Sequence, residues 1–449
     1  MVDLMVNEQR SGTAGKDVPA GYKLTEVGVI PEDWVVISID DCTTKVGSGK
    51  TPTGGASVYI DSGRPFVRSQ NVDWGRLDLA DVVHITDETH NTFSGSEIQQ
   101  DDVLLNITGA SIGRCAKADF RVIGGNVNQH VCIIRTEAKK LSPSLLVELI
   151  NSNYGQNQID SYQAGGNREG LNFSQVKNLK FAITPNSLEQ TEIVRTLNDI
   201  NAFTLALENL IAKKQAIKAA AMQQLLTGKT RLPQFALRKD GSAKGYKKSE
   251  LGEIPEDWNC INLGELGNCI IGLTYKPEDT SDYGTLVLRS SNIQNNHLAY
   301  DDNVFVSIEP PERTIVKEGD ILVCVRNGSR QLIGKCALID KNAQGSAFGA
   351  FMSVFRTDIY GFTFHQFQSD IIQKQIAEVM GATINQITNK DMLGFKIPLP
   401  ENTEEQAAIA AILSDMDKEI QILQQRLDKT RQLKQGMMQE LLTGKIRLI

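Results

Sequence analysis

The chain has 449 residues, which is too long for one ordinary hydrophobic core, so two to four domains are expected. Hydrophobic residues make up 41% of the chain and charged residues 22%, and no apolar run approaches the roughly 18 residues that cross a bilayer. The net charge of −7 argues against a nucleic-acid partner if charge is averaged over the whole molecule.

The cysteines and histidines favour a reducing environment without a metal. The seven cysteines are odd in number and show no C-x-x-C spacing, and the five histidines form no H-E-x-x-H motif. We therefore expect neither a disulfide framework nor a metal site. The first 20 residues are a polar stretch without the apolar core of a signal peptide, so we expect a tail over 1–20 and a cytoplasmic protein.

The first element after the tail begins with a phrase that the chain repeats. Residues 21–34 are "GYKLTEVGVIPEDW" and residues 245–258 are "GYKKSELGEIPEDW", identical at 10 of 14 positions. Four further blocks recur in the same order, among them "LLTGKTRL" (225–232) and "LLTGKIRL" (441–448). The offset stays between 216 and 224, so the chain is an internal duplication of domain-sized units. Pro31 and Pro255 predict an extended entry, anchored by Trp34 and Trp258.

Each copy is predicted to be a β-rich domain followed by one long helix. Short β-like runs such as "DVLLNI" and "GDILVCV" lie within 21–184 and 245–400. Helices are predicted over 185–232 and 401–449, with a linker at 233–244. Ser187-x-x-Gln190 and Thr403-x-x-Gln406 match capping boxes, and Gly228 and Gly444 match C-terminal stop signals.

A heptad stripe runs along both predicted helices. A single amphipathic helix on its own domain would show a similar stripe, but more than four heptads favour a helix–helix seam. An antiparallel pair within the chain gives an α+β protein with a pseudo-twofold axis, in which two similar α/β domains are separated by an intramolecular coiled coil. The predicted seam consists of Ile193, Leu197, Ile200, Leu207, Ile211, Ile409, Leu413, Met416, Ile420, Leu423 and Leu427.

Catalytic signatures are missing from the sequence. "GSGKT" (47–51) has Thr44 where a phosphate loop needs its first glycine, and no G-x-S-x-G or N/D/S-P-P-Y/F/W motif occurs. Cys115 and Cys336 are interpreted as small buried strand residues. We expect a binding protein, with no catalytic residue and no metal ligand.

The polar loops suit duplex DNA. Residues 213–248 carry ten Lys/Arg against one acid, which allows a local anion-facing surface, although a solvated basic helix end and linker is an equally good interpretation. Two similar domains fit two half-sites, and Arg, Asn and Gln are the side chains that pair with base edges. The second copy keeps the framework and changes these loops, as two domains with different half-sites would.

Candidate DNA-binding residues follow from these loops, and a turn-stabilising Asn or a surface Arg is at least as good an interpretation of any single one. In the first copy they are Lys50, Arg64, Arg68, Gln70, Asn71, Asn126, Asn128, Gln129, His130, Asn167, Arg168 and Asn172. In the second copy they are Lys276, Arg289, Ser291, Asn292, Arg326, Asn327, Arg330, Gln331, Asn385 and Gln386.

With these blocks in view, the chain resembles the specificity subunit of type I restriction–modification systems from about Gly21 to Ile449. The motifs are I-P-x-x-W (Ile30–Trp34, Ile254–Trp258), G-x-T-P (Gly49–Pro52), a G-D-I-L…G-K-type block (Asp101–Arg114, Gly319–Lys335), E-Q-x-x-I…L (Glu189–Leu197, Glu405–Leu413) and L-L-T-G-K. The 20-residue tail departs from the family pattern, as does "GLTYKP" in the second copy where the first has "GKTP".

The resemblance implies two target-recognition domains that each read half of a split DNA sequence, with the coiled coil setting the spacing. It also implies two modification subunits that bring S-adenosylmethionine and methylate adenine. Restriction subunits that use ATP and Mg²⁺ would complete the nuclease, so no cofactor is expected on this chain. Two alternatives stay open: a coiled-coil scaffold whose domains bind proteins, and a self-contained enzyme with an unrecognised site.

Overall fold

The computed structural model describes residues 18–163, 170–380 and 385–448, which form two compact units. The first unit contains the described residues up to Leu207 and those from Arg426 onward, so both ends of the chain build it. The second unit is Glu208–Gln425. Of the tail expected over 1–20, only 18–20 lie within the described residues.

The first unit is built around a four-stranded antiparallel sheet of order β4-β10-β7-β8. A hairpin (β1, β2), an antiparallel pair (β3, β11) and a three-stranded sheet of order β6-β5-β9 surround it. Its strands are β1 Tyr22–Thr25, β2 Gly28–Pro31, β3 Val35–Ser38, β4 Thr43–Ser48, β5 Arg64–Val67, β6 Val83–Ile85, β7 Val103–Asn106, β8 Cys115–Lys117, β9 Asn126–Val127, β10 Val131–Thr136 and β11 Lys180–Ile183. Its helices are α1 Asp87–Asn91, α2 Pro143–Asn151, α3 Asn153–Gln163, α4 Phe173–Lys177 and the first part of α5 Ser187–Leu225.

Both faces of this sheet are covered, which explains the uninterrupted apolar runs in its central strands. Leu105 and Cys132 face the cluster that includes α2 and α5, while Leu104 and Ile133 face a second cluster beneath the surrounding loops. Successive strand residues point to opposite faces, so a strand buried on both sides must be apolar throughout. The predicted β-run "DVLLNI" is confirmed as β7.

The second unit repeats the same topology. Its central sheet has order β15-β24-β21-β22, and its hairpin (β12, β13) and outer pair (β14, β25) match those of the first unit. The parallel contact of β5 with β9 recurs between β17 and β23. The internal duplication and the α+β fold class are therefore confirmed at the level of strand order.

Additional elements in the second unit lie mainly in its outer sheet region and in the predicted linker. Its strands are β12 Tyr246–Ser249, β13 Gly252–Pro255, β14 Trp258–Asn262, β15 Gly267–Ile271, β16 Thr280–Ser281, β17 Thr285–Leu288, β18 Ile293–Gln294, β19 His297–Leu298, β20 Phe305–Val306, β21 Ile321–Cys324, β22 Cys336–Leu338, β23 Ala347–Phe348, β24 Met352–Thr357 and β25 Lys396–Pro400. Its helices are α6 Pro233–Ala236, α7 Leu263–Leu266, α8 Tyr360–Phe367, α9 Asp370–Val379, α10 Asn389–Gly394 and the first part of α11 Thr403–Leu441.

The two long helices have 39 residues each, and their ends correct one sequence-based prediction. Gly228 and Gly444 adopt φ of 71° and 70° just beyond the helices, as the stop signals predicted. The capping boxes are wrong, because Asn186 and Asn402 accept the first backbone hydrogen bonds, from Leu188 N and Glu404 N.

Gln190 and Gln406 are buried instead of capping the helices. Gln190 donates to the carbonyl of Thr184 at 2.9 Å, and Gln406 donates to the carbonyl of Pro400 at 2.7 Å. These side chains therefore fasten each helix start to the strand before it, because the capping role is already filled by the preceding asparagine.

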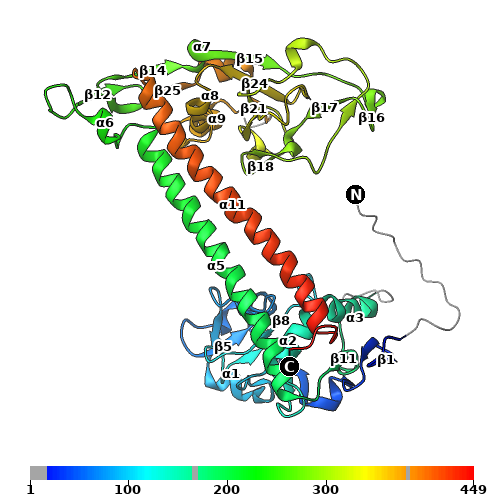
Figure 1. Cartoon of the computed structure of the whole chain (residues 1–449). Helices are drawn as coiled ribbons and strands as arrows, with labels where there is room; N and C mark the ends of the chain where they lie inside the picture. The colour runs from blue at the N-terminus through cyan, green and yellow to red at the C-terminus, as the bar shows by residue number, and fades with distance from the viewer. Residues whose placement is uncertain (1–17, 164–169, 381–384, 449) are drawn as a thin grey trace. The chain divides into compact units, whose positions relative to one another are not determined.

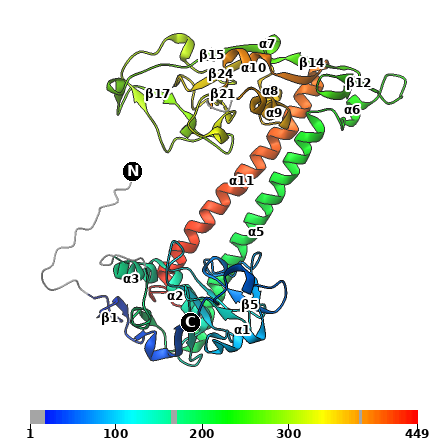
Figure 2. The ribbon, with the colours of Figure 1, turned by 180° about the vertical axis from the view of Figure 1, so that it is seen from behind.

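The helices pair antiparallel within each unit. In the first unit, Ile193 near the start of α5 shares a cluster with Leu441 at the end of α11. In the second, Leu225 at the end of α5 shares a cluster with Ile409 near the start of α11. All eleven predicted seam residues are buried or half-buried. Figure 1 shows α8 and α9 beside the first turns of α11, and Figure 2 shows α2 and α3 beside its last turns.

Candidate nucleic-acid interface

Loops from three strand ends and from the segment after α3 come together at one edge of the central sheet in the first unit. Gly49 N, just after β4, donates to the carbonyl of Asn128 at 3.2 Å. Ile107 N, just after β7, donates to the carbonyl of His130 at 2.9 Å. The carbonyl of Ile107 in turn accepts from Leu171 N at 2.8 Å. The backbone of the framework thus holds the ends of these loops in fixed positions.

Four polar side chains meet at this edge. Thr51 donates to Gln129 Oε1, and Gln129 Nε2 lies 3.1 Å from His130 Nε2. His130 Nδ1 lies 2.5 Å from the Thr108 hydroxyl. Thr51 and Gln129 are exposed, so the cluster presents donors and acceptors to solvent, as a base-reading surface requires.

The same edge of the second unit carries a different set of side chains. Arg326 N donates to the carbonyl of Phe351, and the Arg326 guanidinium lies 5.1 Å from the centre of the Phe351 ring. Asn385 Nδ2 donates to the carbonyl of Gly328 at 2.9 Å, and Asn327 Nδ2 donates to the Ser290 hydroxyl at 3.1 Å. Equivalent framework positions therefore support loops with different chemistry.

Four predicted asparagines serve the interior of their domains. Asn71 and Asn292 are fully buried, and each accepts the backbone N–H of the arginine three residues earlier, at 3.0 and 2.9 Å. Asn126 is buried against His90 and Ser96. Asn128 is buried and accepts from His130 N. The turn-stabilising interpretation is favoured for these four, because a base contact would require the interior to open.

The predicted arginines before these turns are held by acids. Arg64 donates to the Asp87 carboxylate at 2.5 Å and to the Gly124 carbonyl, and Arg68 donates to the Asp81 carbonyl. Arg289 pairs with Asp302 at 2.9 Å. These contacts place the three guanidiniums alongside the domain surface, with part of each still exposed.

The other predicted DNA-binding residues differ mainly in exposure. Gln70 donates to Asp81, and Asn172 caps α4. Asn167 and Arg168 lie outside the described residues. The exposed members are Lys50, Gln70, Gln129, Asn172, Lys276, Arg326, Arg330, Gln331 and Gln386, and the half-buried members are Arg64, Arg68, His130, Arg289, Ser291, Asn327 and Asn385.

Sequence reasoning missed four side chains of the two strand-end clusters. Thr51 and Thr108 belong to the first cluster. Ser290 and Phe351, which has 57% of its surface exposed, belong to the second. Thr51 lies within "GSGKT", next to the predicted DNA-binding residue Lys50. Phe351 lies in a loop that differs between the copies, and an aromatic residue in such a loop is a usable signal.

The basic segment 213–248 is partly neutralised within the second unit. Lys214 pairs with Glu419, Lys218 with Asp417 and Arg238 with Glu256, at 2.7, 2.5 and 2.7 Å. Arg231 and Lys244 share Asp257. Half of its ten cations are therefore engaged with acids, which favours the structural interpretation of this segment over an anion-binding one.

The cysteine prediction is confirmed. Cys115 and Cys336 are buried in β8 and β22, and burial raises the pKa of the Cys336 thiol to about 12, so it stays protonated.

Within the described residues, no group of His, Cys, Asp or Glu has the arrangement of a metal site. None of the helices in that part of the chain has the length and apolar character needed to cross a membrane.

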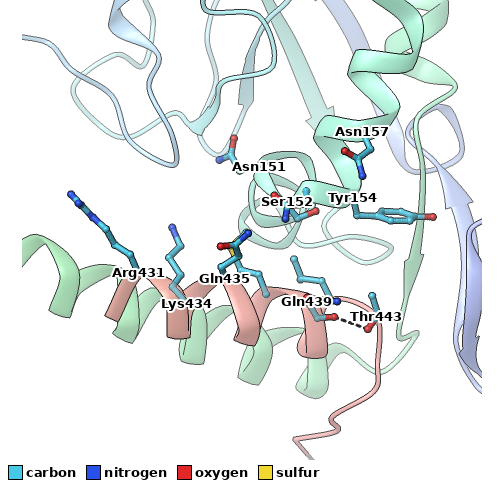
Figure 3. A pocket seen from close by; sticks show the side chains of 12 residues that line it. Asn151, Ser152, Tyr154, Asn157, Arg431, Lys434, Gln435, Gln439 and Thr443 are labelled. Carbon is cyan, nitrogen blue, oxygen red and sulfur yellow. Dashed lines mark hydrogen bonds between the residues drawn. The ribbon is translucent and has the colours of Figure 1, made fainter. Parts of the chain in front are cut away.

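A cavity of about 460 Å³ lies in the first unit between α11 and the α2–α3 corner. Figure 3 shows Arg431, Lys434 and Gln435 on α11 facing the corner that carries Asn151 and Ser152. Helices line this cavity and the strand-end loops do not, so it is separate from the candidate interface.

Type I restriction enzyme specificity subunits align with 70–93% of this chain. It is 23% identical over 427 residues to the type I restriction enzyme MjaVIII specificity subunit of Methanocaldococcus jannaschii, covering 93% of this chain and 94% of the relative. It is 24% identical over 336 residues to the EcoKI specificity subunit of Escherichia coli, covering 70% and 66%.

Solved structures share the fold. The S subunit of the type I restriction–modification system from M. genitalium matches with a TM-score of 0.56 at 15% identity, over 91% of this chain and 96% of that one. A chain from a structure of type I system assembly matches with a TM-score of 0.51 at 17% identity, over 93% and 99%.

The family profile matches each copy of the duplication separately. The type I restriction modification DNA specificity domain matches residues 31–219 and again residues 255–432, which together make up most of the chain. Each match contains most of one recognition domain and much of the long helix that follows it. The chain therefore belongs to the type I restriction modification DNA specificity family.

Proposed function

We propose that this chain directs a type I restriction–modification complex to a split, asymmetric DNA sequence, with each recognition domain reading one half. The observation that carries the proposal is the contrast at the strand-end loops. Gln129 and His130 stand at this edge in the first domain, whereas Arg326 and Asn327 stand there in the second. One framework with two different sets of base-compatible side chains is what an asymmetric target requires.

The long helices hold the two domains for this task and dock the modification subunits. Methyl transfer from S-adenosylmethionine to adenine then takes place in the modification subunits, and ATP- and Mg²⁺-dependent cleavage takes place in the restriction subunits. This chain contributes recognition without a catalytic residue or cofactor of its own. The acidic net charge of −7 fits this division of labour, because partner subunits then supply much of the positive surface facing DNA. Since its target is chromosomal and invading DNA, we place the complex in the cytoplasm.

Two exposed residues in opposite domains provide the test, and each serves as the control for the other. The chain is produced with its modification subunits, and methylated adenines are mapped across a genome for the wild type, Gln129→Ala and Arg326→Ala. Each variant should relax selectivity at one base position, in opposite halves of the site. Loss of one base contact is worth about 1–3 kcal/mol of discrimination.

Other outcomes separate the alternatives. Equal weakening at all sequences would mean that the two side chains contact the DNA backbone and do not read bases. An unchanged methylation map, or loss of complex assembly alone, would favour the scaffold. Methyl transfer by the isolated chain would show that it is an enzyme in its own right.

A further inference from the structure

The repeated phrase at the start of each recognition domain packs on the helix end that comes from the other copy. In the first unit, Pro31 and Trp34 lie against Gly444, which follows α11. A Cβ on Gly444 would come within 2.6 Å of Pro31 Cγ, so only glycine fits. The Tyr22 hydroxyl also donates to the Gly444 carbonyl at 3.4 Å. The phrase therefore forms a receptor for a helix terminus.

An arginine just beyond this glycine completes the contact. Arg447 donates two parallel hydrogen bonds to the Asp33 carboxylate, at 2.9 and 2.8 Å. It also pairs with Glu189 in the first turn of α5, with Nη2 2.8 Å from Oε2. Its guanidinium lies 5.8 Å from the centre of the Trp34 ring. We call Arg447, Asp33, Glu189 and Trp34 the first arginine clasp.

The second unit has the same arrangement. Arg231, which follows α5, donates to Asp257 at 2.8 and 3.2 Å and to Glu405 at 2.6 and 2.7 Å. Its guanidinium lies 5.6 Å from the centre of the Trp258 ring. Arg231, Asp257, Glu405 and Trp258 form the second arginine clasp.

Each clasp joins three separate segments of the chain. They are the start of a recognition domain, the first turn of the helix that follows this domain, and the segment that follows the other long helix. The glutamate in each clasp is buried, and the arginine supplies the hydrogen bonds that a buried carboxylate needs. Burial alone would raise the pKa of Asp257, but hydrogen bonds from Arg231 and Lys244 lower that pKa to about 2. Asp257 therefore stays ionised at every physiological pH.

The clasps fix the orientation of each domain on its helices, which the apolar packing around them does not. Leu441 and Leu442 already hold the end of α11 in the core of the first unit, but hydrophobic contact is non-directional. An arginine that grips two carboxylates fixes angles as well as distance, because its planar fork matches each carboxylate in one orientation. Losing the fork should leave the domain folded and let it rotate on its helices.

We infer that Arg231 and Arg447 are positioning residues that determine how strictly the complex discriminates the spacing between the two half-sites. The inference rests on the proposed function. A domain with a fixed orientation on its helix pair presents its loops to one set of base pairs. A domain whose orientation varies also reaches the base pairs on either side of that set. The first clasp should be the more sensitive to change, because Arg447 is 33% exposed and Arg231 is 7% exposed.

The test uses the full complex and a panel of duplexes that keep both half-sites and vary the spacer. Asp33→Asn removes one of the two carboxylates that pair with Arg447. Arg447→Lys keeps the positive charge but loses the bidentate guanidinium contact. Each should raise methylation at spacers one base pair too short or too long by roughly three- to tenfold relative to the native spacer. Base preference within each half-site should not change. Arg195→Ala is the matched control, since Arg195 is exposed on α5 and pairs only with Glu192 among the contacts of the described residues.

The outcomes separate this inference from the proposal beneath it. If the wild-type complex methylates no pair of half-sites, the proposed function fails. If the wild type is selective and both variants assemble with the same spacer profile, the positioning role is overturned. An altered base preference within a half-site would overturn the positioning role too. Failure of both conservative variants to assemble would also overturn it, because the clasp would then serve folding alone.

Discussion

At the scale of single residues, equivalent positions of the two units place their buried charge on different elements. In the second unit, Lys218 on α5 lies 2.5 Å from Asp417 on α11, beside His365 on α8. In the first unit, the buried Glu148 on α2 accepts from Asn201 on α5; burial raises the pKa of Glu148, and Lys434 on α11 opposes this shift only in part. The acid that contacts α5 therefore lies on α11 in the second unit and on α2 in the first.

His365 gives the second unit a dependence on pH. Burial lowers its pKa from 6.5 to about 4; the nearby Asp417 opposes this shift and Lys218 adds to it. Its other polar neighbour is the Ser414 hydroxyl, 3.0 Å from Nε2. Since the unfolded chain takes up the proton at higher pH than the folded one, the stability from neutral His365 is present above pH 6.5. It is lost as pH falls toward 4.

We predict that His365→Gln removes this loss. The shift corresponds to about 3 kcal/mol, so the wild type should lose up to that much more unfolding free energy than the variant between pH 6.5 and pH 4. Urea unfolding across this range, with hydrogen exchange of α8 as a local reporter, measures the difference. Parallel pH profiles for the two proteins would mean that His365 titrates normally in the folded state.

At the scale of elements, two glycines near the end of α11 should respond oppositely to the same substitution. Gly444 has φ of 70° and no room for a Cβ beside Pro31, whereas Gly436 lies within the helix with open space around it. Gly444→Ala should cost about 2 kcal/mol or more, from the left-handed backbone and the overlap. Gly436→Ala should stabilise the protein by about 0.5–1 kcal/mol, through helix propensity.

Thermal or chemical denaturation of both variants checks this pair. Because both substitutions add the same methyl group to one helix and its terminus, a general effect of volume or hydrophobicity would move them in the same direction. Two changes of equal sign would therefore contradict the role assigned to Gly444 at the receptor formed by the repeated phrase.

The structural features that the sequence predicts correctly are those that depend on residues close together in the chain. Gly228 and Gly444 stop their helices because a left-handed residue after a heptad stripe is a local signal. The caps were assigned one residue too late, since Asn186 and Ser187 both favour that position and only the fold decides between them. The contact of Arg447 with Asp33 joins residues 414 positions apart, and no local sequence pattern predicts it.

The candidate interface follows the same rule. Difference between the copies pointed to the loops around Gln129 and Arg326, and the structure places both loops at the same edge of the sheet, because loop position follows from strand order. Residue type alone did not separate exposed side chains such as Gln129 from Asn71 or Asn126, whose amides form hydrogen bonds inside the domain. An asparagine near a turn suits both roles, and burial decides which one it has.

At the scale of the molecule, the start of the first recognition domain and the last described residues fold together. The last described residues pack into the first unit, where Leu442 shares a cluster with Trp34 and Ile193. The equivalent Leu226 packs with Trp258 in the second unit, which is continuous in sequence. Each recognition domain therefore has its core completed by the long helix of the other copy.

This arrangement predicts that a cavity at the C-terminus weakens the N-terminal domain. Leu442→Ala should cost about 2–5 kcal/mol in the first unit, because it removes buried methyl groups from a packed core. Hydrogen exchange should accelerate within 21–184 and stay unchanged within 245–400. Leu226→Ala is the matched control and should give the reverse pattern. Faster exchange in both domains from either variant would mean that the two units unfold as one, since independent cores confine such damage to the core that carries it.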